Sequence, residues 1–109
     1  MPDNNLTNLI MHVLARTEDG IVNWTESAKR GTFSAAFERS GLNIYSDGRA
    51  ITIELLNSNG QVVDTYTINR PRSSVGGSHE RYDAAKQLYE LAKNQARKID
   101  DLFKDIMSS

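Results

Sequence analysis

A polar segment between residues 70 and 83 carries the residue types that bind anions. It reads RPRSSVGGSHERYD and combines arginines, serines and two adjacent glycines. Guanidinium groups and hydroxyls donate hydrogen bonds to phosphate and carboxylate oxygens. The helix predicted to follow adds the unpaired N–H groups of its first turn. The sequence therefore indicates a candidate anion or partner site, made of Arg70, Arg72, Ser73, Ser74, Gly76, Gly77, Ser78, His79 and Arg81.

A purely structural role explains the same segment without a ligand. The segment lacks the G-x-x-x-x-G-K-[ST] spacing of a phosphate-binding P-loop. A stretch rich in serine, glycine and arginine also suits a plain connection between a strand and a helix, with Ser78 as the helix N-cap. The sequence leaves both interpretations open, the anion or partner site and the connection.

The other reactive side chains form no catalytic or metal-binding motif. The chain has no cysteine, and its two histidines, His12 and His79, are far apart. His79 and Asp83 have an i,i+4 spacing, which also suits acidic residues at the positive end of a helix. Glu54 and Asp64 lie on neighbouring predicted strands and could face each other as an acid and a base, or they are two ordinary strand residues. Alternation alone does not decide this, because a β-bulge would reverse the face of one of them. We expect no catalytic residue, no cofactor and no metal site.

Charge and composition narrow the class of partner. Thirteen Lys and Arg against fourteen Asp and Glu leave a net charge of −1. Nucleic acid is therefore not expected as a partner, because its binding requires a surplus of basic charge. No run of ~18 apolar residues occurs, so no membrane segment is expected. Acids and amides stand near the N-terminus where a signal peptide carries basic residues, which favours a cytoplasmic location.

Apolar periodicity predicts a helix on each side of a β region. The first helix is predicted over roughly residues 4–18, with Gly20 placed to end it. Its apolar face consists of Leu6, Leu9, Ile10, Val13 and Leu14. A long pattern of threes and fours, uninterrupted by Pro or Gly, predicts the final helix from Glu80 to Met107.

Runs with two-residue alternation predict the strands between the helices. These runs are residues 21–25, 32–38, 42–46, 49–56 and 61–69. Their short connections, including Asp47-Gly48, favour antiparallel neighbours. We therefore predict a single α+β domain over residues 1–109. It has an antiparallel four- to five-stranded meander sheet with the N-terminal helix and the long C-terminal helix packed on one face.

The final helix is too long for the predicted sheet to cover. It would extend ~40 Å, whereas a six-residue strand extends ~20 Å. Leu102, Phe103 and Ile106 then need a cover from the first helix or from a second copy, and we expect a homodimer. The predicted core consists of Leu9, Val13, Phe33, Phe37, Ile53, Leu88, Leu91, Ile99 and Phe103.

Residues at both ends of the chain resemble a type of small uncharacterised bacterial single-domain protein. Arg16-Thr17, Gly20 and Trp24 match R-T-x-x-G-x-x-x-W after its first helix, and residues 57–60 match its N-S-N-G turn. Residues 88–103 match its L-Y-E-L-A-K-x-x-A-x-x-I-D-x-L-F helix. The resemblance covers most of the chain. It implies an α-β-meander-α domain and no particular activity.

Two functions from different classes fit these observations. The first is a non-enzymatic protein-interaction or adaptor module whose partner is a protein, with a second copy of the chain as one candidate. The alternative is a small-ligand or anion-binding regulatory protein that uses the segment 70–81. An enzyme ranks third, because no catalytic motif is present.

Overall fold

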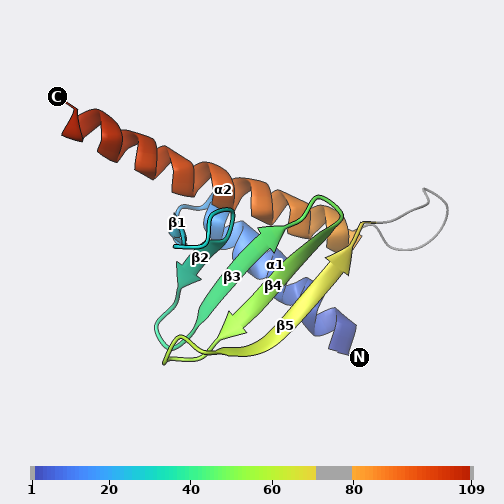
Figure 1. Ribbon diagram of the computed structural model, residues 1–109. Coiled ribbons are helices and arrows are strands. Elements are labelled where there is room, and N and C mark those ends of the chain that lie inside the picture. Colours follow the sequence, from blue (N-terminus) through green and yellow to red (C-terminus); the bar gives the residue numbers. More distant parts are fainter. Residues whose placement is uncertain (1, 71–79, 109) are drawn as a thin grey trace.

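The computed structural model describes residues 2–70 and 80–108, without the side chains of residues 2–4, 99 and 100. A β region lies between two helices along the chain (Figure 1). The elements are α1 (Pro2–Glu18), β1 (Trp24–Glu26), β2 (Phe33–Ala36), β3 (Gly41–Ser46), β4 (Ala50–Leu56), β5 (Val62–Asn69) and α2 (Glu80–Met107). α2 has the bounds that periodicity predicts, whereas α1 begins two residues earlier than predicted and β1 is shorter.

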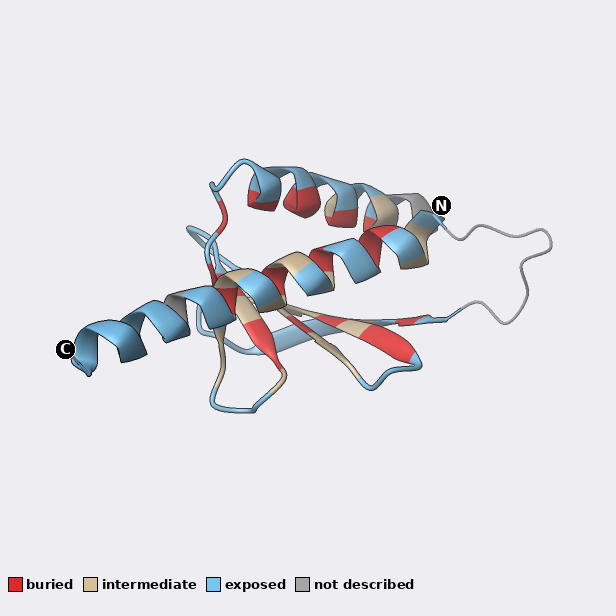
Figure 2. Cartoon of the chain, turned by 90° about the horizontal axis from the view of Figure 1, so that it is seen from above, coloured by how far each residue is buried: buried red, intermediate tan, exposed pale blue. Residues whose placement is uncertain are grey.

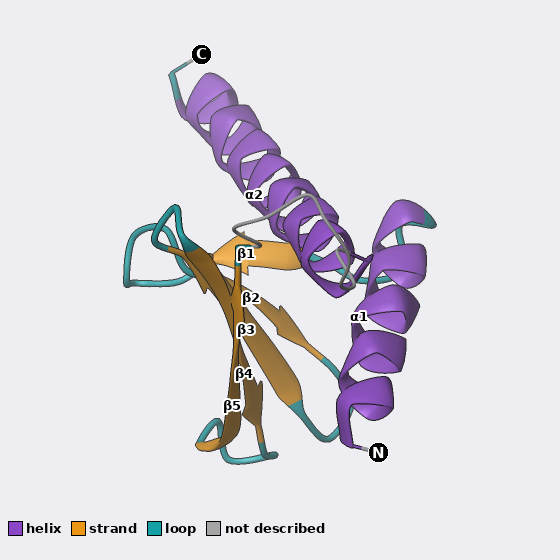
Figure 3. Ribbon diagram, turned by 90° about the vertical axis from the view of Figure 1, so that its right-hand side faces the viewer, coloured by secondary structure: helices purple, strands orange, loops and turns teal. Residues whose placement is uncertain are grey.

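The five strands form one antiparallel sheet in the order β1-β2-β3-β4-β5. Both helices lie on the same face of this sheet, so the predicted α+β meander fold is confirmed (Figure 3). Side chains alternate between the two faces along each strand. In β3, Leu42 and Ile44 are buried under the helices, whereas Asn43 and Tyr45 lie on the uncovered face.

The core fills the space between the sheet and the two helices (Figure 2). Its largest fully buried apolar side chains are Ile10, Trp24, Phe33, Ile44, Ile51, Ile53 and Leu88. The rings of Phe33 and Tyr89 meet edge to face, with 5.8 Å between their centroids. This geometry stabilises an aromatic pair beyond simple burial, and it holds the middle of α2 on β2.

Most of the predicted core is confirmed. Val13, Phe33, Ile53 and Leu88 are buried, and Leu9 and Leu91 pack partly buried against them. Two predictions are wrong. Phe37 is exposed because β2 ends one residue before it, and Phe103 is exposed because α2 has passed the sheet there. Thr32 is a buried polar residue, and Ile99 lies outside the described side chains.

The regular register between β4 and β5 decides which faces of the sheet two carboxylates occupy. A register shift between Leu55 and Leu56 of β4, as a β-bulge produces, lies beyond both of them and does not change their faces. Asp64 pairs with Leu55 on the face that carries the helices. Glu54 precedes Leu55 and therefore points to the opposite face. The two carboxylates do not face each other, so the structure excludes the acid–base pair considered from the sequence.

α1 runs beside α2 in the same direction, but it ends well before α2 does. Near their starts, Arg81 Nε donates to Thr7 Oγ1 over 3.0 Å. Near the end of α1, Gln95 Nε2 donates to the carbonyl oxygen of Thr17 over 3.1 Å. α1 therefore accompanies α2 as far as about Gln95, and the last turns of α2 continue without it (Figure 1).

Candidate functional site

Only two residues of the predicted anion site fall within the described part of the chain. Arg70 follows β5 and is exposed, and its backbone N–H donates to the carbonyl of Arg49 over 2.8 Å. Arg81 uses its guanidinium group in the contact with Thr7 that joins the two helices. The other predicted residues, Arg72, Ser73, Ser74, Gly76, Gly77, Ser78 and His79, lie outside the described residues. The anion site therefore stays a prediction.

A small hollow of about 290 Å³ lies beside Arg70. Its wall is formed by the β3–β4 hairpin and by α2, through Ser46, Gly48, Ile51, Tyr82, Lys86, Tyr89 and Glu90. Arg70 and Lys86 give it two cationic groups, and Glu90 gives it one carboxylate. The hollow is the one described feature that favours an anion near the segment 70–81.

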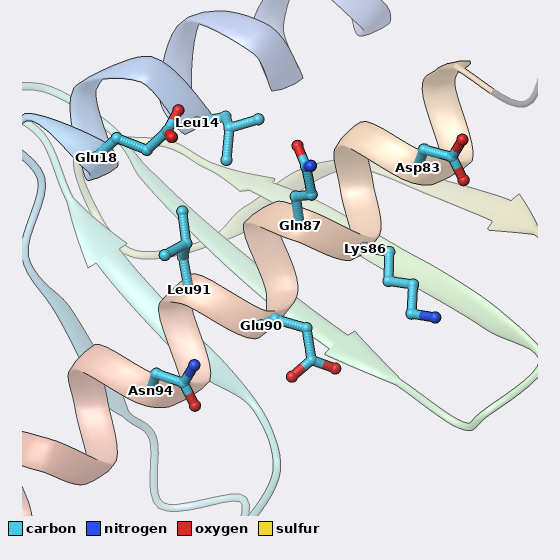
Figure 4. Close-up of a pocket in the computed structure, with 8 residues that line it drawn as sticks. All are labelled: Leu14, Glu18, Asp83, Lys86, Gln87, Glu90, Leu91 and Asn94. Carbon is cyan, nitrogen blue, oxygen red and sulfur yellow. The ribbon is translucent and has the colours of Figure 1, made fainter.

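A shallow space of about 580 Å³ separates α1 from α2 (Figure 4). Leu14 of α1 and Gln87 and Leu91 of α2 point into it. Lys86 and Glu90 point away from α1. The charged side chains at its rim do not converge on one point, so the space has the character of a helix–helix groove and not of a catalytic centre.

The C-terminal part of α2 is the most exposed apolar surface of the described chain. Every residue from 101 to 108 is exposed (Figure 2). The large apolar side chains there keep most of their surface in solvent, with 55% for Leu102, 64% for Phe103, 69% for Ile106 and 82% for Met107. The prediction that the sheet cannot cover the whole helix is confirmed. The described residues of α1 do not cover it either.

Arg97 marks the point where α2 leaves the body of the protein. Its Nε lies 3.7 Å from Glu26 Oε1 of β1. Its guanidinium carbon lies 5.7 Å from the ring centroid of Phe33, a cation–π arrangement. The hydrophobic core therefore ends beneath the Arg97 side chain. The exposed residues Leu102, Phe103, Ile106 and Met107 lie further along α2.

A second apolar feature, not predicted from the sequence, lies between α1 and one end of the sheet. It is a groove of about 640 Å³. We call it the α1 groove; its lining includes Leu9, His12, Val13, Arg16, Ile21, Val22, Ala36, Phe37, Ser40, Leu42, Leu55 and Val63. Arg16 Nε donates to His12 Nε2 over 2.9 Å at its rim, and His12 is exposed.

A row of polar side chains crosses the uncovered face of the sheet. Ser34 Oγ donates to Asn43 Oδ1 over 2.6 Å, and Asn43 Nδ2 donates to Glu54 Oε1 over 3.2 Å. Each carboxylate or amide in this row is paired with a neighbour on the next strand. Such cross-strand pairs stabilise a sheet, and this role accounts for Glu54 without catalysis.

The described residues contain neither a group of metal-binding side chains nor a helix that could span a membrane. Within residues 2–70 and 80–108, no three His, Asp or Glu side chains are grouped as a metal site would require. No helix in these ranges combines the length and the apolar character needed to cross a membrane.

Comparison with known proteins adds no relative. The chain matches no protein-family model, no curated protein and no solved structure at a significant level. The resemblance to small bacterial α-β-meander-α proteins therefore stays a prediction, and the function has to be argued from the geometry.

Proposed function

We propose that this protein is a non-enzymatic protein-interaction module that works in the cytoplasm and binds through the C-terminal part of α2. The observation that carries this proposal is the apolar face of Leu102, Phe103, Ile106 and Met107 beyond the sheet. The first partner that we propose is a second copy of the chain, which makes the module a homodimer.

The spacing of these residues supports a helix–helix interface. Leu102 and Ile106 are four residues apart, as are Phe103 and Met107, so all four side chains share one side of the helix. Fully burying a side chain of this size contributes about 1.5–3 kcal/mol relative to leaving it in water. A helix in another copy offers the same face and can cover it.

The size of the surface supports a dimer of modest affinity. Four large apolar side chains, each more than half exposed, form a patch on the order of 500 Å². Two such patches bury about 1,000 Å² in total, which is the lower limit for a specific interface. Asp101 and Lys104 flank the patch with charges of both signs. Two copies can therefore meet without the repulsion that one sign alone would cause.

Light scattering over a range of protein concentrations tests this proposal. We expect the mass to rise from one chain toward two between low and high micromolar concentration. Phe103→Glu should keep the protein monomeric, because the charge would have to be buried. Met11→Glu is the matched control, since Met11 is an exposed apolar residue of α1, and it should dimerise like the wild type. A wild-type chain that stays monomeric at high micromolar concentration would overturn the proposal.

The hollow beside Arg70 favours a second candidate, an anion-binding regulatory protein. Arg70 and Lys86 line that hollow together, next to the segment 70–81. Phosphate should then raise the melting temperature more than chloride at matched ionic strength, because a ligand that binds only the native state stabilises it. Arg70→Ala should remove this difference. An equal effect of the two salts on the wild type would exclude this candidate.

A further inference from the structure

The α1 groove has the dimensions of a small-molecule site. α1 packs along α2, and its Cα atoms remain more than 8 Å from those of every strand. In Figure 3, α1 stands beside α2 and apart from the strands. The α1 groove, between α1 and the strands, has a volume of about 640 Å³. Sites for small organic ligands commonly measure about 300–1,000 Å³.

The walls of the α1 groove are apolar, and some of their side chains are exposed to solvent. Val13, Val22 and Leu42 are buried residues at its base. Ile21 and Val63 keep 59% and 62% of their surface exposed at its sides. Exposed β-branched side chains around a concave surface favour a ligand that removes them from water. The body of that ligand should therefore be apolar.

One cation stands at the rim of this apolar surface. Among the described residues that line the groove, Arg16 is the only lysine or arginine, and none is an Asp or a Glu. The bond from Arg16 Nε to His12 Nε2 holds the guanidinium group in place. Among the described residues, no other hydrogen bond or ion pair uses its remaining N–H groups. Those groups are free to bind a carboxylate in two-point fashion.

The geometry points to a binding site for a small monocarboxylic acid with an apolar body, in which Arg16 binds the carboxylate and the α1 groove holds the body. A single acidic group is favoured, because the described lining provides one lysine or arginine and no second. The proposed interface on α2 shares no residue with this site. Binding of the acid therefore does not depend on self-association.

A magnetic resonance titration of the full chain with decanoate, below its micelle concentration, tests the site. We expect saturable shifts of the backbone amides of Ile21, Ser40 and Val63. Decan-1-ol should bind at least about tenfold more weakly, because it lacks the charge-assisted pair with Arg16. Acetate should cause no shift, because it lacks the apolar body.

Three variants connect the binding to the groove. Arg16→Gln should abolish the advantage of decanoate over decan-1-ol, whereas Arg49→Gln, an exposed arginine that does not line the groove, should keep it. Ala36→Phe fills the groove from an exposed position of β2 and should block both ligands. The site would be refuted if decanoate caused no saturable shift, if the shifts arose at residues 102–107 instead, or if both ligands bound the wild type equally.

Discussion

The indole of Trp24 donates its N–H to the hydroxyl of Thr17 over 3.1 Å, and both side chains are buried. The same hydroxyl donates to the carbonyl oxygen of Val13 over 2.7 Å. The carbonyl of Thr17 accepts the Gln95 side chain of α2. Thr17 thus links the end of α1 both to β1 and to α2. These contacts hold α1 in its position beside the α1 groove.

Replacement of Thr17 by valine should destabilise the protein, because it leaves the indole N–H of Trp24 buried without a partner. An unpaired buried donor costs about 1–3 kcal/mol, so urea denaturation should show a loss of that size in the free energy of unfolding. Thr17→Ser keeps the hydroxyl and should lose less. Equal losses for the two variants would mean that the hydrogen bond contributes nothing.

Gly20 should resist replacement for a reason of backbone geometry alone. Its φ is +77°, and an added Cβ would meet no atom of the described residues within 4 Å, apart from those of its two chain neighbours. α1 closes through a bond from the N–H of Ile21 to the carbonyl of Arg16, 2.9 Å long, as in a Schellman motif. Gly20→Ala should cost about 1–2 kcal/mol in thermal unfolding. Gly20→Asn should cost less, since asparagine tolerates this conformation, and the reverse order would contradict the explanation.

The motif R-T-x-x-G-x-x-x-W now has a physical interpretation. Thr17 and Trp24 form the buried hydrogen bond, and Gly20 provides the left-handed turn that brings them together. The sequence predicted the turn from Gly20 but not the bond, because a propensity says where a helix ends and not what it then contacts. This local structure accounts for the spacing of the motif without a ligand.

Periodicity predicted which side of α2 is apolar but not what lies opposite that side. Leu88 and Phe103 fit the apolar spacing of three and four residues equally well, yet Leu88 is buried and Phe103 is not. The difference depends on where β1 and β2 end relative to the helix. The α1 groove escaped prediction for a similar reason. Its lining residues, such as Ile21 and Val63, come from separate elements whose distance no local pattern encodes.

Two leucines of α2 should respond differently to truncation. Leu88→Ala removes a fully buried side chain and should lower the free energy of unfolding by about 2–5 kcal/mol. Leu102→Ala changes an exposed position and should stay within about 0.5 kcal/mol, when measured at a concentration where the chain is monomeric. The same Leu102→Ala variant should dimerise more weakly. A large loss of stability in monomeric Leu102→Ala would show that α2 is covered within one chain.

Tyr66 should ionise only at unusually high pH, because its hydroxyl donates to Asp64 Oδ2 over 2.6 Å. This hydrogen bond to the carboxylate raises the pKa of Tyr66 above its ordinary value of about 10. The native state holds the proton more tightly than the unfolded state. The stabilisation is therefore fully present below pH ~10 and is lost as the pH rises through the higher pKa of the folded protein.

An ultraviolet titration of tyrosinate absorbance checks this pKa. The chain has four tyrosines, so Tyr66→Phe identifies which part of the titration belongs to Tyr66, and we expect the part that disappears to lie above pH ~10. Asp64→Asn removes the carboxylate and should return the pKa of Tyr66 toward 10, whereas Asp83→Asn, on α2 and not bonded to Tyr66, should leave it unchanged. If Asp64→Asn left the titration as it is in the wild type, the hydrogen bond from Tyr66 to Asp64 would not be the cause of the raised pKa.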